Sequence, residues 1–243
     1  MHVWLPEGIS TIAPAVDRLF YIILWLTGAV FVLVQATLLY FLVRYRRQAG
    51  QPAHYTHGNT MVEVVWTVIP AVILVALALH SQRIWAQVRG TPPPAALEVA
   101  ITGQQFAWNV HYPGTDQQFG RTSPALVDEA SNPVGLDRTD PNAADDIVTV
   151  NQLHLPVNRV ALLHLKSKDV IHSFFVPQFR MKQDMVPGFT GQLWVSATKA
   201  GSYEIACAEL CGLGHYRMRG FLTVESDEAF AMWLADALKE QQG

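Results

Sequence analysis

The stretch Cys207-Ala208-Glu209-Leu210-Cys211-Gly212-Leu213-Gly214-His215-Tyr216-Arg217-Met218 places two thiols, an imidazole and a thioether close together in the chain. A further histidine, His172, lies upstream, and Cys207 and Cys211 are the only cysteines. Thiolate and thioether are soft ligands and imidazole suits copper, so the mixed set favours copper over a hard cation. Zinc sites use Cys, His and carboxylates, which leaves Met218 without a role. The motif therefore predicts a copper site.

Two simpler interpretations use fewer of these donors. In an exported protein, two cysteines four residues apart can form a disulfide. A single-copper electron-transfer site uses one cysteine, two histidines and a weak methionine ligand. That site leaves the second cysteine unexplained.

The run Cys-x-Glu-x-Cys-Gly-x-x-His-x-x-Met resembles the binuclear copper (CuA) loop of cytochrome c oxidase subunit II. His172-Ser173-Phe174 and Arg180-x-Lys182-x-Asp184-x-x-Pro187-Gly188 match the same family in the same order. The resemblance covers nearly the whole chain. It implies a cupredoxin-like Greek-key barrel and a set of copper ligands.

In that set the two cysteines bridge two copper ions, and each histidine binds one of them. The thioether is the weak ligand of one copper, and the backbone carbonyl of Glu209 is the weak ligand of the other. The Glu209 side chain, turned away from copper, holds a magnesium ion at the border with subunit I. The implied copper ligands are His172, Cys207, Glu209, Cys211, His215 and Met218.

The composition predicts a membrane portion. Half of the residues are hydrophobic, only 15% are charged and the mean hydropathy is +0.17. Residues 19–43 are uncharged and long enough to cross a bilayer, and a second span covers about residues 62–80. The basic run Arg44-Tyr45-Arg46-Arg47 places the loop between the spans in the cytoplasm, so both termini lie outside. The net charge of −3 argues against a nucleic-acid partner.

Glu63 stands near the cytoplasmic end of the second span. An acid at a helix end can lie at the interface, but ionisable groups in membrane helices also mark ion paths. The segment 63–70 resembles the family's second helix, where the matching glutamate stands at the mouth of a proton path that uses a subunit I lysine. The resemblance implies this role for Glu63.

Residues 1–90 form the N-terminal segment and the transmembrane hairpin. Three further parts follow them. Residues 91–94 are a Pro-rich, stiff linker. Residues 95–225 contain short β-rich runs bounded by turn residues, which predict an all-β sandwich or barrel. Residues 226–243 predict a short C-terminal helix with Ser226 as its N-cap.

Two features of the β domain carry open interpretations. The acidic, irregular segment from Asp116 to Asp146 is either a solvated insertion or a docking face for a basic cytochrome c. The stretch 103–112 matches a family segment in which a tryptophan often receives the electron from cytochrome c. Phe106 holds that position here and Trp108 matches a later aromatic, so both are candidates for electron uptake. Core packing is the alternative for Trp108.

The resemblance implies a subunit of a proton-pumping cytochrome c oxidase that passes electrons from cytochrome c, or a membrane-bound c-type donor, through copper to haem in subunit I. Oxygen is then reduced to water there. Implied partners are subunit I, subunit III and the lipid bilayer, with the copper domain on the periplasmic or intermembrane-space side. The unusual aromatic stretch and the insertion favour a bacterial inner membrane. The alternatives are a quinol oxidase subunit II, which lacks the copper donors, and a copper-delivery protein, which needs neither the Glu63 helix motif nor Glu209.

Overall fold

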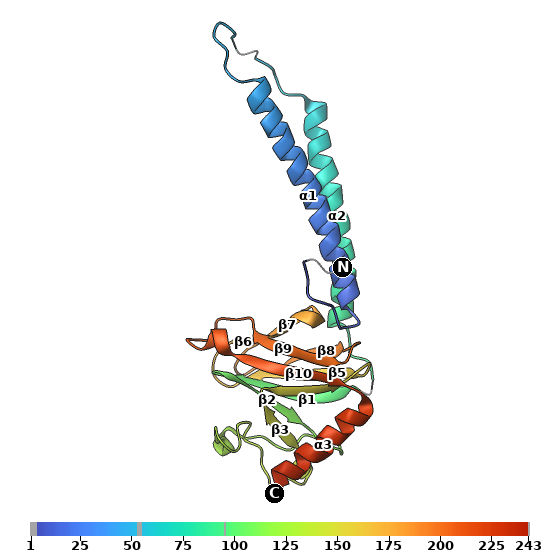
Figure 1. Cartoon of the computed structure of the whole chain (residues 1–243), viewed down its shortest axis with the longest axis vertical. Helices are drawn as coiled ribbons and strands as arrows, with labels where there is room; N and C mark the ends of the chain where they lie inside the picture. The colour runs from blue at the N-terminus through green and yellow to red at the C-terminus, as the bar shows by residue number, and fades with distance from the viewer. Residues whose placement is uncertain (1–3, 53–54, 95, 243) are drawn as a thin grey trace. The chain divides into compact units, whose positions relative to one another are not determined.

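A computed structural model describes residues 4–52, 55–94 and 96–242 (Figure 1). The chain forms two compact units. One contains residues up to Pro14 together with those from Arg89 onward, and the other contains Ala15–Val88.

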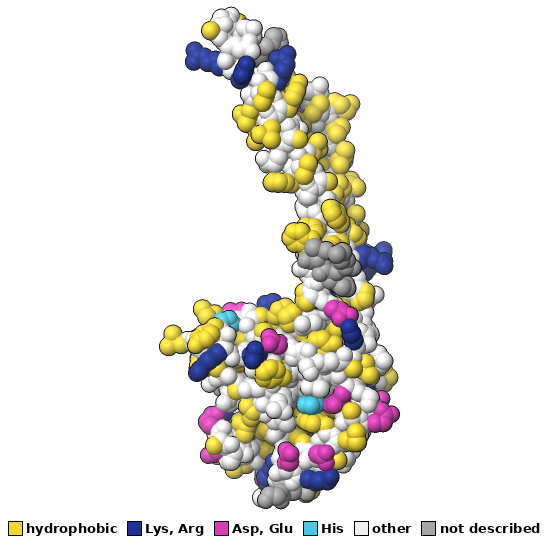
Figure 2. All heavy atoms as spheres, viewed as in Figure 1, with side chains coloured by type: hydrophobic (Ala, Val, Ile, Leu, Met, Phe, Trp, Pro, Cys, Tyr) yellow, Lys and Arg dark blue, Asp and Glu magenta, His cyan; other side chains and the backbone are white. Residues whose placement is uncertain are grey.

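The helical unit is built from α1 (Ala13–Arg44) and α2 (Thr60–Arg89), which contain the two predicted spans. Both helices are long and apolar enough to cross a membrane, with mean hydropathies of 2.3 and 2.5 over their most apolar windows. Their Leu, Val, Ile and Phe side chains are largely exposed, and Figure 2 shows hydrophobic side chains along the helices. An exposed apolar surface of this extent fits lipid as its surroundings.

The β unit consists of two five-stranded sheets. The first has the order β3 (Ile147–Val150), β2 (Ala107–Tyr112), β1 (Leu97–Gln104), β5 (Val160–Ser167) and β8 (Gly191–Ser196). The second has the order β4 (Gln152–Pro156), β10 (Arg219–Glu225), β9 (Gly201–Cys207), β6 (His172–Val176) and β7 (Met181–Met185).

Most neighbouring strands in these sheets are antiparallel, but β1 pairs with β5 and β10 with β4 in parallel. Because parallel neighbours cannot be joined by a hairpin, the chain crosses between the sheets. The predicted cupredoxin-like Greek-key fold is thereby confirmed as a flattened barrel. Its core is formed by the inward-facing residues of both sheets, including the fully buried Ile101, Leu163, Phe174 and Leu222.

The residues before α1 belong to the β unit. Ile9 is fully buried, its amide donates to Gln178 O at 2.9 Å, and its carbonyl accepts from Thr198 N at 2.7 Å. The Ser10 hydroxyl donates to Phe179 O at 2.7 Å. Gln178 and Phe179 lie in the 3-10 turn Pro177–Phe179 of the second sheet, whereas Thr198 follows β8 of the first. The N-terminal segment thus links the two sheets at one edge.

The segment from Asp116 to Asp146 is irregular, as predicted, with the short 3-10 turns Pro124–Leu126 and Pro141–Ala143. Its acids hold it in place. Asp146, fully buried, accepts from His111 Nε2 at 2.6 Å and from Gly120 N at 2.8 Å. Glu129 accepts from Lys168 Nζ at 2.6 Å. These carboxylates therefore serve to fold the insertion onto the first sheet.

The C-terminal helix α3 (Asp227–Gln242) begins as predicted. The Ser226 hydroxyl accepts from Ala229 N at 3.2 Å, which satisfies one of the free amides of the first turn. Trp233 stacks on His154 of β4 with ring centroids 3.9 Å apart, and it also contacts Tyr112 of β2. The helix thus covers β3 and β4, which are edge strands of the first and the second sheet.

The substitution Ile9→Ala tests whether the N-terminal segment stabilises the β unit. Removing a fully buried side chain leaves a cavity, so we expect the free energy of unfolding to fall by about 2–5 kcal/mol. Urea unfolding of the purified chain in detergent, followed by tryptophan fluorescence, measures it. Met232→Ala on the exposed side of α3 is the matched control and should change stability by less than about 0.5 kcal/mol. Equal effects of the two substitutions would contradict the role assigned to the segment.

Candidate metal centre

Strand pairing brings two of the predicted ligands together. His172 is the first residue of β6 and Cys207 the last of β9, and these strands are antiparallel neighbours. Phe174 pairs with Cys207, and His172, two residues earlier, points to the same face. His172 is fully buried. The chain then forms a loop of residues 208–218, called the metal loop, and returns through the 3-10 turn His215–Arg217 into β10.

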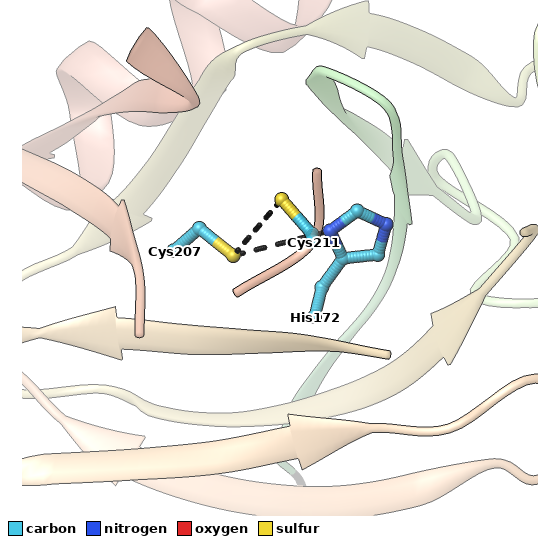
Figure 3. A group of neighbouring side chains, drawn as sticks. All are labelled: His172, Cys207 and Cys211. Atoms are coloured by element: carbon cyan, nitrogen blue, oxygen red, sulfur yellow. Dashed lines mark hydrogen bonds between the residues drawn. The ribbon is translucent and has the colours of Figure 1, made fainter. Parts of the chain in front are cut away.

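The two thiols lie at the centre of the site, 3.8 Å apart and unbonded (Figure 3). Cys207 Sγ lies 3.9 Å from His172 Nδ1 and 3.2 Å from Glu209 O. The other thiol, Cys211 Sγ, lies 3.7 Å from the Nδ1 of His215 and 3.7 Å from the Met218 sulfur. Each thiol therefore has one imidazole and one weaker donor beside it. Six predicted donors are brought together as two similar halves.

The donor set fits copper. The described residues contain one cluster with metal-binding geometry, His172, Cys207 and Cys211, whose ligand atoms lie within 4.8 Å of one another. Soft sulfur and imidazole donors dominate it, and no carboxylate is part of it. The thioether of Met218 is buried beside Cys211, and a thioether is a ligand that suits copper but is not usual for zinc.

A carboxylate that the sequence analysis missed orients His172. Asp169 Oδ1 lies 2.8 Å from the Nε2 of the ring and also accepts from Val170 N. Because Nε2 is engaged by the carboxylate, Nδ1 is the nitrogen directed at Cys207. The signal in the sequence was an acid three residues before the histidine, which by itself is common.

In the metal-free protein the pKa values of the two thiols are shifted in opposite directions. Burial raises the pKa of Cys207, but hydrogen bonds with His172 and with the backbone outweigh it and lower the pKa to about 6. Burial and the neighbouring Cys207 together raise the pKa of Cys211 to about 11. Burial lowers the pKa of His172, yet Cys207 and Asp169 raise it by more, so the net shift is upward.

The two candidate aromatics lie in different places. Phe106 is half-buried and packs on the metal loop, where a Cβ added to Gly214 would lie 2.5 Å from its ring. Trp108 is fully buried and contacts His172 edge-on, with ring centroids 6.2 Å apart. The structure thus brings Phe106 to the outside of the metal loop and Trp108 behind a donor.

The other predicted site residues lie outside the cluster. The Glu209 side chain is exposed while its carbonyl faces Cys207. Glu63 lies in the first turn of α2 in the helical unit, with an exposed side chain. At the tip of the metal loop, Leu210, Leu213 and Tyr216 are also exposed, Leu213 by 98%. These three side chains form an exposed apolar tip on the loop.

The comparisons with known proteins agree with this geometry. The family described as "Cytochrome C oxidase subunit II, transmembrane domain" matches residues 1–84, and "Cytochrome C oxidase subunit II, periplasmic domain" matches residues 97–225. The alternative cytochrome c oxidase subunit 2 of Bradyrhizobium diazoefficiens is 38% identical over 232 residues, which cover 95% of this chain and 82% of the relative. Cytochrome c oxidase subunit 2 of Cereibacter sphaeroides is 34% identical over 242 residues, 94% of this chain and 78% of the relative.

A solved structure is also similar to the β unit. The crystal structure of the periplasmic domain of subunit II of cytochrome oxidase of Bradyrhizobium japonicum is 30% identical and covers 62% of this chain and 99% of that domain, with a TM-score of 0.46. Both family matches together span the two apolar helices and the β unit that holds the donor cluster. The chain therefore belongs to the cytochrome c oxidase subunit II family and is a two-span membrane subunit of a haem-copper oxidase.

Proposed function

We propose that this chain is the subunit through which electrons enter a proton-pumping cytochrome c oxidase. When bound, two copper ions supply the one-electron redox change by which an electron from cytochrome c, or from a membrane-bound c-type donor, reaches haem in subunit I. The observation that carries the proposal is the pair of thiols 3.8 Å apart, each with its own imidazole and its own weak donor. A single-copper site gives the second thiol no use.

In this proposal each half of the site would hold one copper ion. The thiolates of Cys207 and Cys211 would be shared by both ions, and the imidazoles of His172 and His215 would each hold one of them. Glu209, by its carbonyl, and Met218, by its sulfur, would be the weaker donors of the Cys207 half and the Cys211 half. Burial of His172, Cys211 and Met218 excludes water from the ligand atoms. His172 and Cys207 are held on neighbouring strands and Asp169 orients the imidazole, so that little rearrangement of these two donors would accompany a change of charge.

Electron uptake is assigned to Phe106 on the surface of the metal loop. Its ring lies on Gly214, one residue from His215, and the guanidinium of Arg217 lies 5.8 Å from its centroid. Trp108, which is buried against His172, supports the donor from inside. The exposed Glu209 carboxylate is free to hold magnesium together with subunit I. The proposed partners are subunit I, subunit III and the cytochrome c donor.

Residues of the helical unit carry the proton-path role and determine the orientation of the chain in the membrane. Glu63, in the first turn of α2, stands at the mouth of the proton path, and the exposed Arg44, Arg46 and Arg47 at the end of α1 keep the connecting loop in the cytoplasm. The β unit then lies on the periplasmic side of a bacterial inner membrane.

The first test is copper content with electron paramagnetic resonance on the full-length chain in detergent. We expect two copper ions per chain and one unpaired electron shared by both nuclei. Cys211→Ser should abolish the shared signal because it removes a thiolate from both metals. One localised copper in the unsubstituted chain, or a Cys207–Cys211 disulfide in place of metal, would contradict the proposal.

The acidity of the two thiols predicts which one is modified first. At about pH 7 the metal-free Cys207, with a pKa of about 6, is mostly thiolate, whereas Cys211, with a pKa of about 11, keeps its proton. We therefore expect iodoacetamide to label Cys207 much faster, as read by mass spectrometry of the peptides. Copper loading should protect both thiols. Equal labelling rates in the metal-free protein would show that the polar surroundings of Cys207 do not lower its pKa.

The substitution Glu63→Gln tests the proton-path role in the assembled oxidase. The amide cannot exchange a proton at this position, so we expect slower oxygen consumption. The copper signal should be unchanged, because Glu63 lies in the helical unit and the donors in the β unit. Thr67→Val, one turn along the same helix, is the control and should retain turnover. Unchanged turnover in Glu63→Gln would contradict the proton-path role of Glu63.

A further inference from the structure

The turn between β1 and β2 contributes none of the proposed metal ligands, yet it touches both halves of the site. β1 and β2 belong to the first sheet, whereas His172 and Cys207 lie in the second. The connection is short, because β1 ends at Gln104 and β2 begins at Ala107. It therefore carries contacts from one sheet directly to the donor cluster of the other.

Gln105, in this turn, donates a hydrogen bond toward each half of the site. Its backbone amide donates to Asp169 Oδ2 at 2.7 Å, and its side-chain amide donates to the Cys211 carbonyl at 2.6 Å. Asp169 holds the imidazole of His172 in the first half of the site. Cys211 belongs to the second half. One residue thus links both halves by hydrogen bonds.

The neighbours of Gln105 support the same link. A Cβ added to Gly103 would lie 3.1 Å from His172 Cδ2, so the imidazole packs against the backbone of β1. On the other side, the Phe106 ring packs on Gly214 of the metal loop. Within the described residues, the Gln105 side chain is the donor that reaches the Cys211 carbonyl. The loop around Cys211 has an exposed tip at Leu213, so this bond anchors its buried side.

We propose that Gln105 is a positioning residue of the metal centre. Its side-chain bond to the Cys211 carbonyl, with its backbone bond to Asp169, sets the position of the Cys211 half relative to the Cys207 half, which contains His172. This inference rests on the proposed copper function and adds a residue that binds no metal. Groups that orient metal ligands affect metal affinity by roughly 10–100-fold when they are removed.

The test uses Gln105→Glu and Gln105→Ala in the full-length chain. Glu keeps the size and the backbone donor but has no side-chain N–H to give to the Cys211 carbonyl. Ala removes the donor without adding a charge. In both variants we expect copper to pass to a chelator such as bathocuproine roughly 10–100-fold faster. The hyperfine pattern of the paramagnetic signal should shift as well.

A second measurement needs no metal. In the metal-free variants, the backbone amides of residues 211–214 should exchange hydrogen faster than in the unsubstituted chain, as read by mass spectrometry. Gln118→Glu in the insertion is the matched control, since its side chain contacts Asn142 and not the metal loop. It should leave copper release, spectrum and loop exchange unchanged.

The outcomes separate the two proposals. Unchanged copper release and unchanged loop exchange in both Gln105 variants would overturn the positioning role, and so would an effect confined to Gln105→Glu, which would reflect its charge. If the unsubstituted chain fails to bind two copper ions, the proposed function fails. Loop exchange in the metal-free variants then still decides whether Gln105 anchors the loop.

Discussion

Antiparallel pairing of β6 with β9 brings His172 beside Cys207, although 35 residues separate them in the chain. The remaining donors follow from this pairing, because Cys211, His215 and Met218 lie within the loop that leaves β9 and returns to β10. Backbone hydrogen bonds between strands are therefore the interaction on which the site depends. The metal loop starts and ends in the same sheet, and its two ends meet where the Cys207 amide donates to the Met218 carbonyl.

The same closeness determines the charge of the site. Two thiols at 3.8 Å cannot both ionise easily, since the second negative charge forms beside the first. The surroundings resolve the competition in favour of Cys207, which faces His172 and backbone donors, and against Cys211, which is buried next to the thioether. The metal-free cluster thus holds one negative charge readily, and a bound cation is needed to stabilise the second.

Local sequence predicts the parts of this protein that depend on neighbouring residues. Five of the six predicted donors fall within residues 207–218, the spans are continuous apolar runs, and Ser226 lies next to the amides that it caps, so each could be expected from neighbouring residues. The roles of the donors, and the place of His172 among them, came from the family resemblance. The contacts of Asp169, Gln105 and Ile9 could not. Asp169 and Gln105 meet because the β1–β2 turn lies against the segment before β6, and Ile9 is buried because an edge of the barrel is open to it. The insertion differs again, because its acids suggested a charged surface whereas Asp146 is buried against His111.

The segment that contains Ile9 constrains the path of the chain through the membrane. Ile9 and Ser10 are bonded to residues that come after both apolar helices, namely Gln178, Phe179 and Thr198. Two segments that share hydrogen bonds must lie on the same side of a bilayer. The chain between them must therefore cross an even number of times, which agrees with two spans. The order of synthesis also matters, because the segment that contains Ile9 is made before both helices and its binding partners are made more than 160 residues later. Ile9 and Ser10 can therefore form these bonds only after the strands on either side of their partners have been made.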